Sequence, residues 1–302
     1  MRIPSDVEQT ARQLGDPRDA APKAAVLMEA LPYIRQWAGK TMVIKVGGEI
    51  LDDERILDAF ATDVTLMRLV GMNPVIIHGG GPQISDVMSK FDRKPEFIEG
   101  QRVTDPETLQ IVKMVLLGQI NKGIVTAINQ HGCRAAGISG EDGQLLEARK
   151  YPGPTGEQLG FVGEVSRVNP EILHSLVAGE FVPVVGPIGV GPDGSYNINA
   201  DMAAGAIARE LGAEKIIFLT NIEGLYGDFA KDKHPMSRVT VAELNSLLAG
   251  NSISAGMIPK IVSVVGAVSA GVPRAHILDG RVSHALLVEI LTDNGSGTMV
   301  TP

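Results

Sequence analysis

Val75-Ile76-Ile77-His78-Gly79-Gly80-Gly81-Pro82 is an apolar run that passes directly into three glycines and a proline. The run predicts a buried strand that ends in a turn free of side chains. Pro82 stands where the first residue of a helix belongs, so free N–H groups and the positive end of a helix dipole would face an anion. The turn matches neither the dinucleotide-binding fingerprint nor the P-loop, which argues against a Rossmann dehydrogenase and a P-loop ATPase. His78 is interpreted as a hydrogen-bonded turn residue rather than a catalytic base.

Apolar strands and helices alternate on both sides of this stretch. Short β-branched runs predict buried strands at 41–46, 74–78, 134–138, 181–185, 215–220 and 275–278. Helical periodicity lies between them at 54–70 and, most clearly, at 106–131, where apolar residues recur at steps of three and four. Pro- and Gly-rich residues 152–156 precede a period-two run, which predicts an antiparallel hairpin within 145–168. This order is typical of an α/β fold with a mostly parallel sheet.

Composition and charge exclude several classes of protein. The 302 residues are 44% hydrophobic and carry 27 Lys plus Arg against 35 Asp plus Glu, a net charge of −8. The sequence has no basic stretch that could contact successive phosphates of a nucleic acid, so we expect no nucleic acid partner. Cys133 is the single cysteine, so an intramolecular disulfide and a Cys-built zinc site are excluded, and a reducing cytoplasm fits. Residues 1–23 lack the apolar region of a signal peptide, and no long uncharged apolar window follows, so we expect neither secretion nor a membrane span.

Residues 1–40 are expected to form an N-terminal extension to a domain at 41–302. A polar beginning is followed by a helix that Pro32 would kink or restart. One face of this helix is apolar and carries Val26, Leu27, Ala30, Leu31, Ile34 and Trp37. Such a face must be buried, either against its own domain or against a neighbouring subunit, and the sequence leaves both open.

A second glycine turn, Ile44-Lys45-Val46-Gly47-Gly48, carries a lysine inside a predicted strand. Buried lysine is rare unless it is paired, so Lys45 is expected to emerge at the end of the strand, where Gly47 and Gly48 direct N–H groups toward an anion. A tight turn with an incidental lysine is the alternative. Two anion-ready turns on separate strands argue for a phosphate ligand.

Two further motifs open helices. Asn197 and Asn199 point the same way from an extended strand, and Asp201 lies near a helix start, where helix capping is the alternative to a catalytic role. Lys260 would oppose the dipole in the first turn of a helix and therefore needs an anionic partner, either a phosphate or Asp201. The stretch 220–226 follows another strand and would form an adenine and ribose crevice at the carboxyl end of the sheet.

Taken together, these motifs resemble the amino acid kinase family over residues 30–300. In the family's order they are Lys45-Val46-Gly47-Gly48, His78-Gly79-Gly80-Gly81-Pro82, Gly100-Gln101-Arg102-Val103-Thr104, Asn197-Ile198-Asn199-Ala200-Asp201 and Gly256-Met257-Ile258-Pro259-Lys260. Each motif is modest, but five in one order are highly specific. Within the family they resemble the members that phosphorylate N-acetyl-L-glutamate, the second step of arginine biosynthesis.

The resemblance implies a three-layer α/β/α sandwich with a mostly parallel central sheet. Residues 41–195 would form an N-lobe for the acyl amino acid, and residues 196–302 a C-lobe for ATP. The implied catalytic residues are Lys45 and Lys260, which would steady the migrating phosphoryl group, and Asp201, which would orient both lysines. The implied substrate residues are Gly80, Gly81, Arg102, Asn197 and Asn199. The implied nucleotide residues are Gly47, Gly48, Thr220, Asn221, Gly224, Tyr226 and Met257. Mg²⁺ would be held mainly by the ATP phosphates, without a metal site made by the protein.

Phosphoryl transfer suits these residue types. A loose, in-line transition state spreads negative charge over the equatorial oxygens, so the protein mostly positions and neutralises. The γ-carboxylate of N-acetylglutamate is already ionised near neutral pH, so no general base is needed and the product is an acyl phosphate. The bidentate fork of Arg102 suits the substrate α-carboxylate better than a lysine would.

Two positions depart from the family pattern. Asn221 stands where the family usually has Asp, and Glu49 adds a carboxylate beside the first glycine pair, where small or apolar residues are common. Neither position touches the two lysines.

Both ends of the chain resemble the arginine-inhibited branch of the family. In that branch the N-terminal helix interlaces dimers into a hexameric ring, a trimer of dimers. Tyr33, Glu289 and Gly295 are implied in binding L-arginine, and a carboxylate such as Glu289 is the natural partner of a guanidinium. A plain C-terminal segment with a solvated Glu289 is the alternative. The sequence does not decide whether a regulatory protein of nitrogen signalling also docks here.

Three other functions stay open. The same fold would serve another acidic substrate such as carrier-linked aminoadipate, but the 197–201 motif favours N-acetylglutamate. A catalytically silent regulatory member would keep the fold, but Lys45, Asp201 and Lys260 are intact. An NAD-dependent oxidoreductase would need a dinucleotide fingerprint, which is missing.

Overall fold

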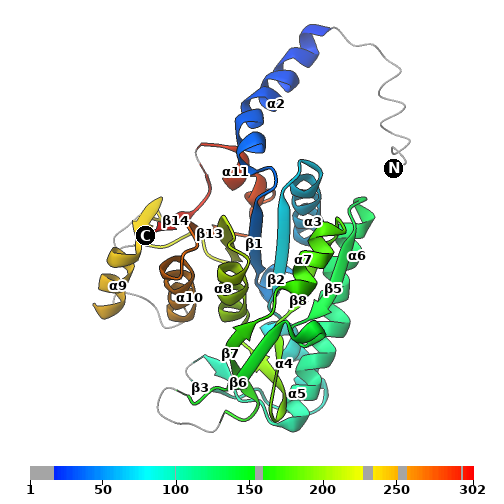
Figure 1. The fold of residues 1–302 in the computed structure, drawn as a ribbon, viewed down its shortest axis with the longest axis vertical. Helices are drawn as coiled ribbons and strands as arrows, with labels where there is room; N and C mark the ends of the chain where they lie inside the picture. Colours follow the sequence, from blue (N-terminus) through cyan, green and yellow to red (C-terminus); the bar gives the residue numbers. More distant parts are fainter. Residues whose placement is uncertain (1–16, 99, 154–158, 227–233, 251–256, 294) are drawn as a thin grey trace.

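The centre of the computed structural model is an eight-stranded sheet (Figure 1). The structure describes residues 17–98, 100–153, 159–226, 234–250, 257–293 and 295–302. In sheet order the strands are β12 (Arg238–Thr240), β14 (Thr298–Thr301), β13 (Ala275–Asp279), β11 (Lys215–Thr220), β1 (Thr41–Val46), β2 (Asn73–His78), β8 (Val182–Gly186) and β5 (Ala135–Ser139). Neighbouring strands run parallel except for the antiparallel pair β13–β14. The predicted sheet is confirmed, and the six predicted strands agree with the structure to within one residue at each end.

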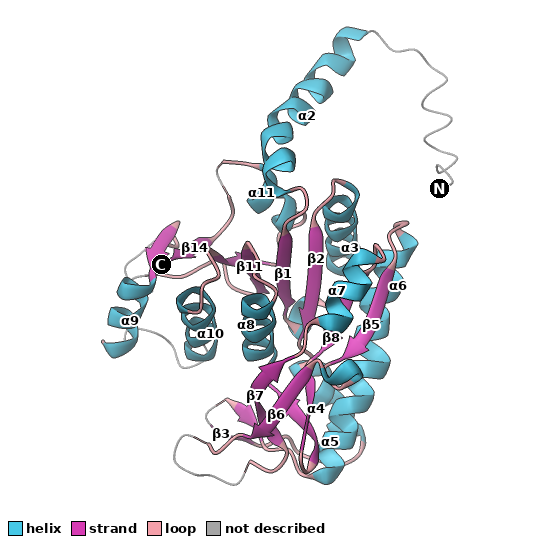
Figure 2. Ribbon diagram, viewed as in Figure 1, coloured by secondary structure: helices cyan, strands magenta, loops and turns pink. Residues whose placement is uncertain are grey.

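Helices cover both faces of this sheet (Figure 2). One face carries α3 (Glu54–Leu69), α4 (Gly81–Lys90), α6 (Asn121–Gln130) and α11 (Ala285–Leu291), and the other carries α7 (Glu171–Ala178), α8 (Ala200–Glu210), α9 (Val241–Ala249) and α10 (Ile258–Ser269). Alternate residues of a strand point to opposite faces, so Met42, Ile44 and Val46 join one core while Val43 joins the other. Two cores on either side of one sheet make the three-layer α/β/α sandwich that the resemblance implies.

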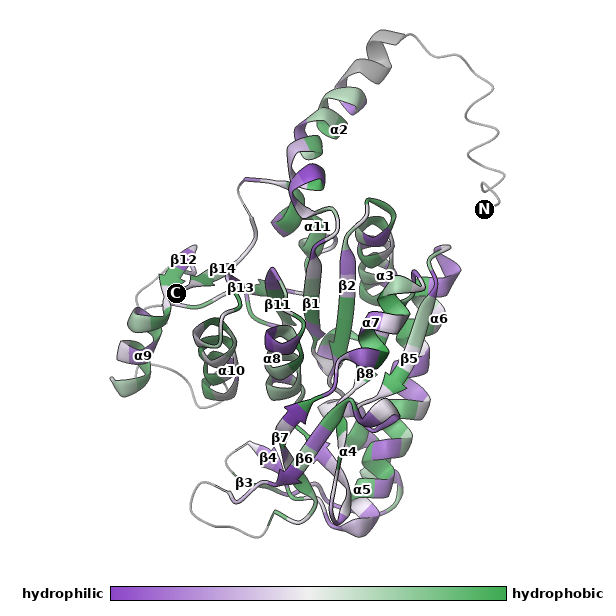
Figure 3. Ribbon diagram, in the orientation of Figure 1, coloured by the Kyte–Doolittle hydropathy of each residue, from purple (hydrophilic) through white to green (hydrophobic). Residues whose placement is uncertain are grey.

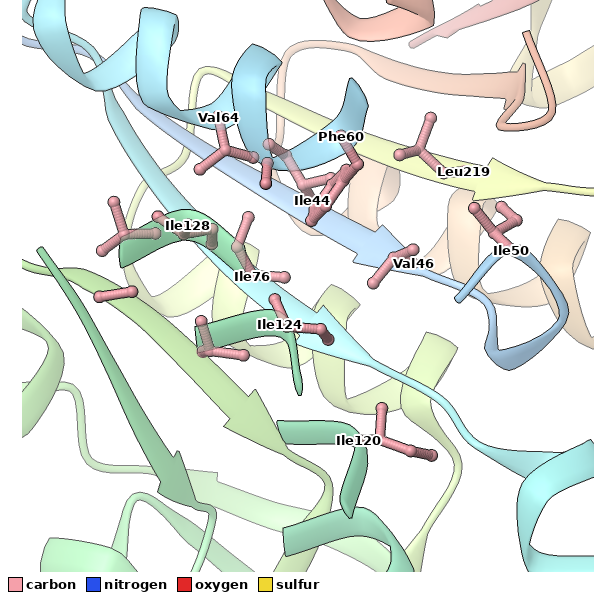
Figure 4. Packing of buried hydrophobic residues seen from close by; sticks show 14 of the residues in the cluster. Ile44, Val46, Ile50, Phe60, Val64, Ile76, Ile120, Ile124, Ile128 and Leu219 are labelled. Atoms are coloured by element: carbon pink, nitrogen blue, oxygen red, sulfur yellow. The ribbon is translucent and has the colours of Figure 1, made fainter. Parts of the chain in front are cut away.

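Figure 4 shows the core on the α3 and α6 face. Ile44 and Ile76 from the two central strands meet the side chains of both helices, Phe60 and Val64 from α3 and Ile124 and Ile128 from α6. β-branched side chains suit the strand positions because they pack well on a pleated surface. This core fixes the strands whose carboxyl ends carry the glycine turns.

The predicted helix at 106–131 is present as one continuous element. It consists of α5 (Pro106–Lys113), a π-helical segment (Met114–Ile120) and α6. Asp105 caps its start by accepting the N–H of Thr108 at 2.7 Å, and Gly132, with φ of +87°, follows its end. It is the one helix in the described part of the chain that is long and apolar enough to cross a membrane. Its apolar stripe is nevertheless buried in the protein core, as in a core helix of a soluble protein.

Four strands close into a small barrel beside the sheet. They are β6 (Leu146–Lys150), β7 (Val162–Val168), β9 (Ile188–Gly191) and β10 (Gly194–Ile198). The antiparallel pair β6–β7 confirms the predicted hairpin, whose residues 154–158 lie outside the described residues. The β9–β10 hairpin was not predicted, although Asp193-Gly194 is a turn signal and Gly194 adopts φ of +111°. A second hairpin joins β3 (Phe97–Ile98) and β4 (Gln101–Arg102).

The N-terminal helix α2 (Pro17–Trp37) extends away from the sheet, with apolar segments along its length (Figure 3). It continues through Pro32, so the helix does not restart there. Val26 and Leu27 are 65% and 70% exposed, whereas Tyr33 and Trp37 pack against the core. Packing on its own domain therefore holds only for the last turns of α2.

Candidate active site

The two glycine turns follow β1 and β2, and the carboxyl ends of these strands lie beside that of β11. Because β2, β1 and β11 are adjacent and parallel, their carboxyl ends meet. The N–H of Gly47 donates to Leu219 O at 3.2 Å and the N–H of Gly79 to Val46 O at 2.9 Å, which ties each turn to the next strand. The turns enclose a cavity of about 290 Å³. Its lining consists of Lys45, Gly47, Gly48, Glu49, Ile50, Gly79, Gly80, Gly81, Pro82, Thr220, Asn221 and Lys260.

Asp201 joins the two lysines of this cavity. Lys45 Nζ lies 2.7 Å from Asp201 Oδ1, and Lys260 Nζ lies 3.5 Å from Asp201 Oδ2. Lys45 and Asp201 are each 6% exposed, so their ion pair is buried. Asp201 and Lys260 stand in the first turns of α8 and α10, two helices that pack against each other. The structure thus gives Lys260 the carboxylate partner that its place in the helix demands.

Helix capping, the alternative role for Asp201, belongs to Asn199 instead. Asn199 Oδ1 accepts the N–H groups of Asp201 at 2.9 Å and of Met202 at 3.3 Å. The side chain of Asp201 is therefore released from the backbone and can hold both lysines. Asn199, predicted as a substrate residue, uses its carbonyl oxygen in this cap.

Burial and charge act against each other in this cluster. Burial alone would raise the pKa of Asp201, but the ammonium groups of Lys45 and Lys260 outweigh it and hold the pKa below its ordinary value. Burial, and next the charge of Lys45, lower the pKa of Lys260 in spite of Asp201. An arriving phosphate would add negative charge beside Lys260 and favour its protonated form.

Free backbone N–H groups line the same cavity. Among the backbone hydrogen bonds of the described residues, the N–H groups of Gly48, Gly80 and Gly81 do not donate. A Cβ at Gly80 would collide with the side chains of Ile120 and Leu116, so glycine lets this turn lie close against the long helix. Gly81 begins α4, whose positive dipole end adds to the N–H groups. The two turns form an anion site flanked by two lysines.

Arg102 lies buried behind the second turn and is not an ordinary surface arginine. Its Nη2 donates to Gly81 O at 2.9 Å and to Ser85 Oγ at 2.8 Å, and its guanidinium carbon lies 4.7 Å from the ring centroid of Phe97. Burial lowers the pKa of Arg102, although a guanidinium stays charged at any physiological pH. Because these partners are neutral, the charge of Arg102 is available to a carboxylate.

Asn197 is linked to Arg102 through one threonine. Asn197 Nδ2 donates to Thr104 Oγ1 at 3.2 Å, and Thr104 Oγ1 donates to Arg102 O at 2.8 Å. Asn199 lines a second cavity, of about 400 Å³, between β7, α8 and α10. Of the predicted substrate residues, Gly80 and Gly81 thus line the smaller cavity and Asn199 the larger one. Thr104, which stands in a quoted motif, had no predicted role.

Three predicted nucleotide residues do not line the smaller cavity. Gly224 adopts φ of +154° and packs against Pro235 and Thr298. Tyr226 donates from its hydroxyl to Glu223 Oε2 at 2.8 Å, and Met257 precedes the first turn of α10. Gly256 lies outside the described residues. The structure brings Gly47, Gly48, Thr220 and Asn221 together, the part of the predicted nucleotide set nearest the anion site.

The residues predicted to bind L-arginine lie at the opposite, amino-terminal ends of the strands, where the end of α2 meets α11. Glu289 Oε1 lies 2.7 Å from His276 Nδ1, and Glu289 Oε2 accepts the N–H of Ser296 at 2.9 Å. Burial opposes ionisation of Glu289, but His276 outweighs it and lowers the pKa of Glu289. Gly295 leaves room for the same carboxylate, since a Cβ there would lie 2.8 Å from Glu289 Oε2. A hydrogen bond with Asp293 raises the pKa of Tyr33 at the end of α2. Glu289 is thus a partnered, largely buried carboxylate and not a solvated one.

Lys215, beside this carboxylate, was not predicted as a functional residue. It is 4% exposed, and its Nζ lies 4.6 Å from the ring centroid of Trp37. Trp37 in turn donates from Nε1 to Ile290 O at 3.1 Å. The sequence signal was present, because Lys215 begins a fully apolar strand, just as Lys45 interrupts one.

Gln83 was also missed, and it connects the two glycine turns. Gln83 lies in the first turn of α4, directly after the second glycine turn. Its Nε2 donates to Gly48 O of the first turn at 2.7 Å and to Asp52 Oδ1 at 2.6 Å. Nothing in the local pattern marks a glutamine for this role, because the contact spans residues distant in the sequence.

His78 behaves as predicted for a hydrogen-bonded turn residue. It is fully buried, and burial lowers its pKa to about 4. Its Nδ1 lies 3.1 Å from Gly79 O, and its Nε2 lies 3.2 Å from Asn121 Nδ2. A neutral, fully bonded imidazole outside the cavity is no base for a substrate.

Comparison with known proteins agrees with this geometry. The model of the amino acid kinase family matches residues 40–279. The chain is 50% identical to an acetylglutamate kinase of Thiobacillus denitrificans over 288 residues, 93% of this chain and 97% of the relative. An acetylglutamate kinase of Pelotomaculum thermopropionicum is also 50% identical, over 92% of this chain and 97% of its own.

Solved structures share the fold. An N-acetylglutamate synthase from Neisseria gonorrhoeae, complexed with coenzyme A and N-acetyl-glutamate, superposes with a TM-score of 0.82 at 26% identity, over 92% of this chain and 63% of the synthase chain. A carbamate kinase from Giardia lamblia bound to AMP-PNP superposes with a TM-score of 0.66 at 16% identity, over 87% of this chain and 99% of its own, and supports the fold alone. Because the family model spans most of the chain and relatives at 50% identity cover nearly all of it, the chain belongs to the amino acid kinase family.

Proposed function

We propose that this protein transfers the γ-phosphoryl group of ATP to the γ-carboxylate of N-acetyl-L-glutamate, giving N-acetyl-L-glutamyl 5-phosphate and ADP in arginine biosynthesis. The observation that carries the proposal is the Lys45–Asp201–Lys260 cluster, which faces free N–H groups from two glycine turns. Acetylglutamate kinases at 50% identity support the choice of substrate.

The charges of the cavity suit the transition state of this reaction. Negative charge spreads over the oxygens of the transferred group, and Lys45, Lys260 and the glycine N–H groups are arranged to neutralise it. Asp201 keeps the two ammonium groups from repelling each other out of the cavity, since it bonds to both. The carboxylate acceptor is ionised at neutral pH, so no residue has to remove a proton.

Mg²⁺ would enter with ATP, whose phosphates would supply most of its ligands. Among the described residues no group of three or more His, Cys, Asp or Glu side chains could hold a metal ion. Glu49 is the carboxylate of the cavity lining that would offer one ligand, which fits the preference of Mg²⁺ for one or two carboxylates, phosphates and water. The bound ion would neutralise charge on the phosphates.

The two lobes would divide the ligands between them. Residues 41–195 would take N-acetylglutamate, with Arg102 on its α-carboxylate and Asn197 nearby, and residues 196–302 would take ATP. The link through Thr104 supports this placement, because it holds Arg102 and Asn197 in one network.

The test is a hydroxylamine-trapping assay that detects the acyl phosphate directly. N-acetylglutamate, glutamate, aspartate and 2-aminoadipate derivatives are offered in parallel with MgATP. Turnover with N-acetylglutamate above all others is expected. Turnover confined to another acid contradicts the substrate, and binding of ATP without any turnover identifies a catalytically silent member of the family.

Feedback inhibition by L-arginine is the second part of the proposal. Glu289 would pair with the guanidinium, Lys215 would receive the α-carboxylate, and Tyr33 and Gly295 would border the ligand. The support is geometric, since Gly295 lies against the Glu289 carboxylate, the charge of Lys215 acts on that carboxylate, and Tyr33 hydrogen-bonds with Asp293, which follows α11. Inhibition curves measured with arginine and with citrulline test this, because citrulline lacks the positive charge that Glu289 would require.

A hexamer built as a trimer of dimers follows from the same resemblance. The exposed apolar side chains of Val26, Leu27, Met28 and Leu31 on α2 support docking on another copy of the chain. The site at the end of α2 would then lie beside the helix that joins the subunits. We place the protein in the cytoplasm, and a regulatory protein of nitrogen signalling is a further candidate partner of the assembly.

A further inference from the structure

A chain of buried polar groups lies behind the second glycine turn. Asn121 Nδ2 donates to Val184 O at 2.9 Å and lies 3.2 Å from His78 Nε2. His78 Nδ1 lies 3.1 Å from Gly79 O. His78 and Asn121 are 0% and 1% exposed and do not line the cavity, yet the chain ends on a residue that does.

The first member of this chain fixes the direction of every bond in it. Val184 O and Ile138 O, at 2.9 and 3.4 Å from Asn121 Nδ2, can only accept, so the NH₂ group of Asn121 must face them. Of its two hydrogens, one is donated to Val184 O at 2.9 Å and the other to His78 Nε2 at 3.2 Å, which is closer than Ile138 O. His78 Nε2 therefore accepts and carries no proton. The proton of the neutral imidazole is then on Nδ1, from which it donates to Gly79 O.

The bond to Gly79 O also decides where the next N–H group points. In a trans peptide the C=O and the following N–H point in opposite directions within one plane. With Gly79 O drawn toward His78, the N–H of Gly80 is turned away from His78. Among the described residues, that N–H donates to no backbone acceptor, and Gly80 lines the cavity.

A run of three glycines needs such an external hold. Glycine has no side chain to restrict its backbone. The N–H of Gly79 donates to Val46 O, and Gly80 O and Gly81 O accept from Ile84 N–H and Arg102, so in this turn it is the Gly79–Gly80 peptide that depends on His78. The neighbouring strand makes room for the hold, because a Cβ at Gly137 of β5 would collide with Asn121 Oδ1.

We propose that His78 and Asn121 are positioning residues for phosphoryl transfer. Asn121 selects the Nδ1–H tautomer of His78, and His78 holds the Gly79–Gly80 peptide so that the N–H of Gly80 is aimed at the transferred phosphoryl group. The inference rests on the proposed kinase function for the identity of that group. A pre-aimed N–H acts most strongly on charge that grows in the transition state, so its loss lowers kcat more than it raises KM.

The tautomer is tested first, by ¹⁵N NMR of the histidine side chains in the full-length protein without ligands. His78, assigned from the signals that disappear in His78→Asn, is expected to carry its proton on Nδ1, with an unprotonated Nε2. A proton on Nε2 would overturn the inference whatever the substrate is. In Asn121→Leu, which removes the NH₂ group, both tautomers are expected.

A matched pair of variants then tests the hold on the peptide. The amide of Asn in His78→Asn falls near the place of Nδ1 and can still donate to Gly79 O, whereas the amide of Gln in His78→Gln falls near the place of Nε2 and cannot. We expect kcat to fall about 10- to 100-fold in His78→Gln, somewhat less than the loss of a whole oxyanion donor, with KM for both substrates nearly constant. His78→Asn is expected to retain kcat to within about threefold.

Thr65→Val is the control for altering a buried polar side chain, since Thr65 is buried on α3, outside the cavity lining. Its kcat and KM are expected to match those of the native protein. Equal losses in His78→Asn and His78→Gln, or no loss in either, would overturn the inference. If the native protein shows the Nδ1–H tautomer but phosphorylates an acid other than N-acetylglutamate, the proposed substrate fails, and the same pair of variants is compared with the acid that is used.

Discussion

Lys45 and Lys215 occupy neighbouring parallel strands, Lys45 inside an apolar run and Lys215 at the start of one, and each lies close to a largely buried carboxylate. In the register of β1 and β11, Met42 lies beside Lys215 and Lys45 beside Phe218, so Lys215 lies toward the amino edge of the sheet and Lys45 toward the carboxyl edge. Lys45 pairs with Asp201, and the charge of Glu289 acts on Lys215. Two buried lysines of one sheet thus lie at opposite ends of its strands.

The surroundings of the two lysines differ in one decisive way. Around Lys45 the chain turns through glycines that leave N–H groups free, and the result is an anion site. Around Lys215 the indole ring of Trp37 covers the charge, and burial lowers the pKa of Lys215. The carboxyl ends of the strands, with their glycine turns, suit phosphoryl transfer. The amino ends, covered by α2 and α11, suit the binding of a regulatory ligand. Each prediction below would break or sharpen this division.

The largest effect is expected for Lys45→Met, which keeps the length of the side chain and removes its charge. Loss of transition-state neutralisation should lower kcat by roughly 10³-fold, in the range seen when a preorganised donor is removed, with a smaller change in KM. Steady-state kinetics with MgATP and N-acetylglutamate measure this. An effect on KM alone would contradict the role of Lys45. Lys90→Met, on an exposed helix face, is the control.

Asp201→Asn should lower kcat by about 10²-fold, since the lysines lose the carboxylate that orients them but keep their charges. The affinity for ATP, measured by calorimetry, should rise or stay constant, because a negative charge beside the phosphate site is gone. A variant that binds ATP much more weakly would show that Asp201 serves the fold rather than the reaction.

At the opposite edge, Glu289→Gln should raise the arginine concentration for half-inhibition at least about tenfold, because a charged pair to the guanidinium is replaced by a neutral contact. For each variant, the rate with arginine is compared with the rate of the same variant without arginine. Unchanged inhibition would place the arginine site elsewhere. Glu180→Gln, an exposed carboxylate on the same chain, should leave the inhibition curve as it is.

The pH dependence of kcat/KM follows from Lys260. Its pKa lies below the ordinary value of 10.5, and only the protonated form neutralises phosphate, so kcat/KM for ATP should fall as the pH rises, with a midpoint below 10.5. The profile of kcat should lie at higher pH, because bound phosphate raises the pKa of Lys260. In Lys260→Arg the fall should move to higher pH, since a guanidinium keeps its charge. A midpoint that does not move would assign the titration to another group.

The smallest effect on the rate is expected for Leu27→Glu on α2. Leu27 is 70% exposed in the single chain, so the substitution should leave the fold and kcat nearly unchanged. If α2 docks on another copy, light scattering should show hexamers of the native protein and dimers of the variant. Equal masses would remove α2 from the assembly. Glu29→Gln, an exposed polar position on the same helix, is the control.

The sheet was predictable from the sequence because its strands are continuous apolar runs bounded by glycine. The long helix was predictable because a stripe of apolar residues from Leu109 to Ile128 and a capping Asp105 agree. The β9–β10 hairpin escaped because its two short strands carry little hydrophobic signal of their own and are fixed by closing into a barrel with β6 and β7.

In the candidate site, Lys45 and Lys260 were predictable because each breaks a local rule, a charge in a buried strand and a cation at a helix start. The glycines were predictable as turns free of side chains, whereas the role of Asp201 came from the resemblance to the family, since its position also suited helix capping. Gln83, Asn121 and Thr104 were not, because their bonds join elements distant in the sequence and no local pattern announces them. Capping by Asn199 rather than Asp201 depended on a backbone angle that composition does not specify.

The central claim, that the carboxyl edge of the sheet performs the phosphoryl transfer, is tested most directly by single-turnover trapping with γ-³²P-labelled ATP, N-acetylglutamate and hydroxylamine. The native protein should give labelled phosphate and trapped hydroxamate in equal amounts, and Lys45→Met should give neither on the same timescale while still binding ATP in a parallel titration. Undiminished hydroxamate from Lys45→Met would contradict the claim and move the chemistry away from this edge.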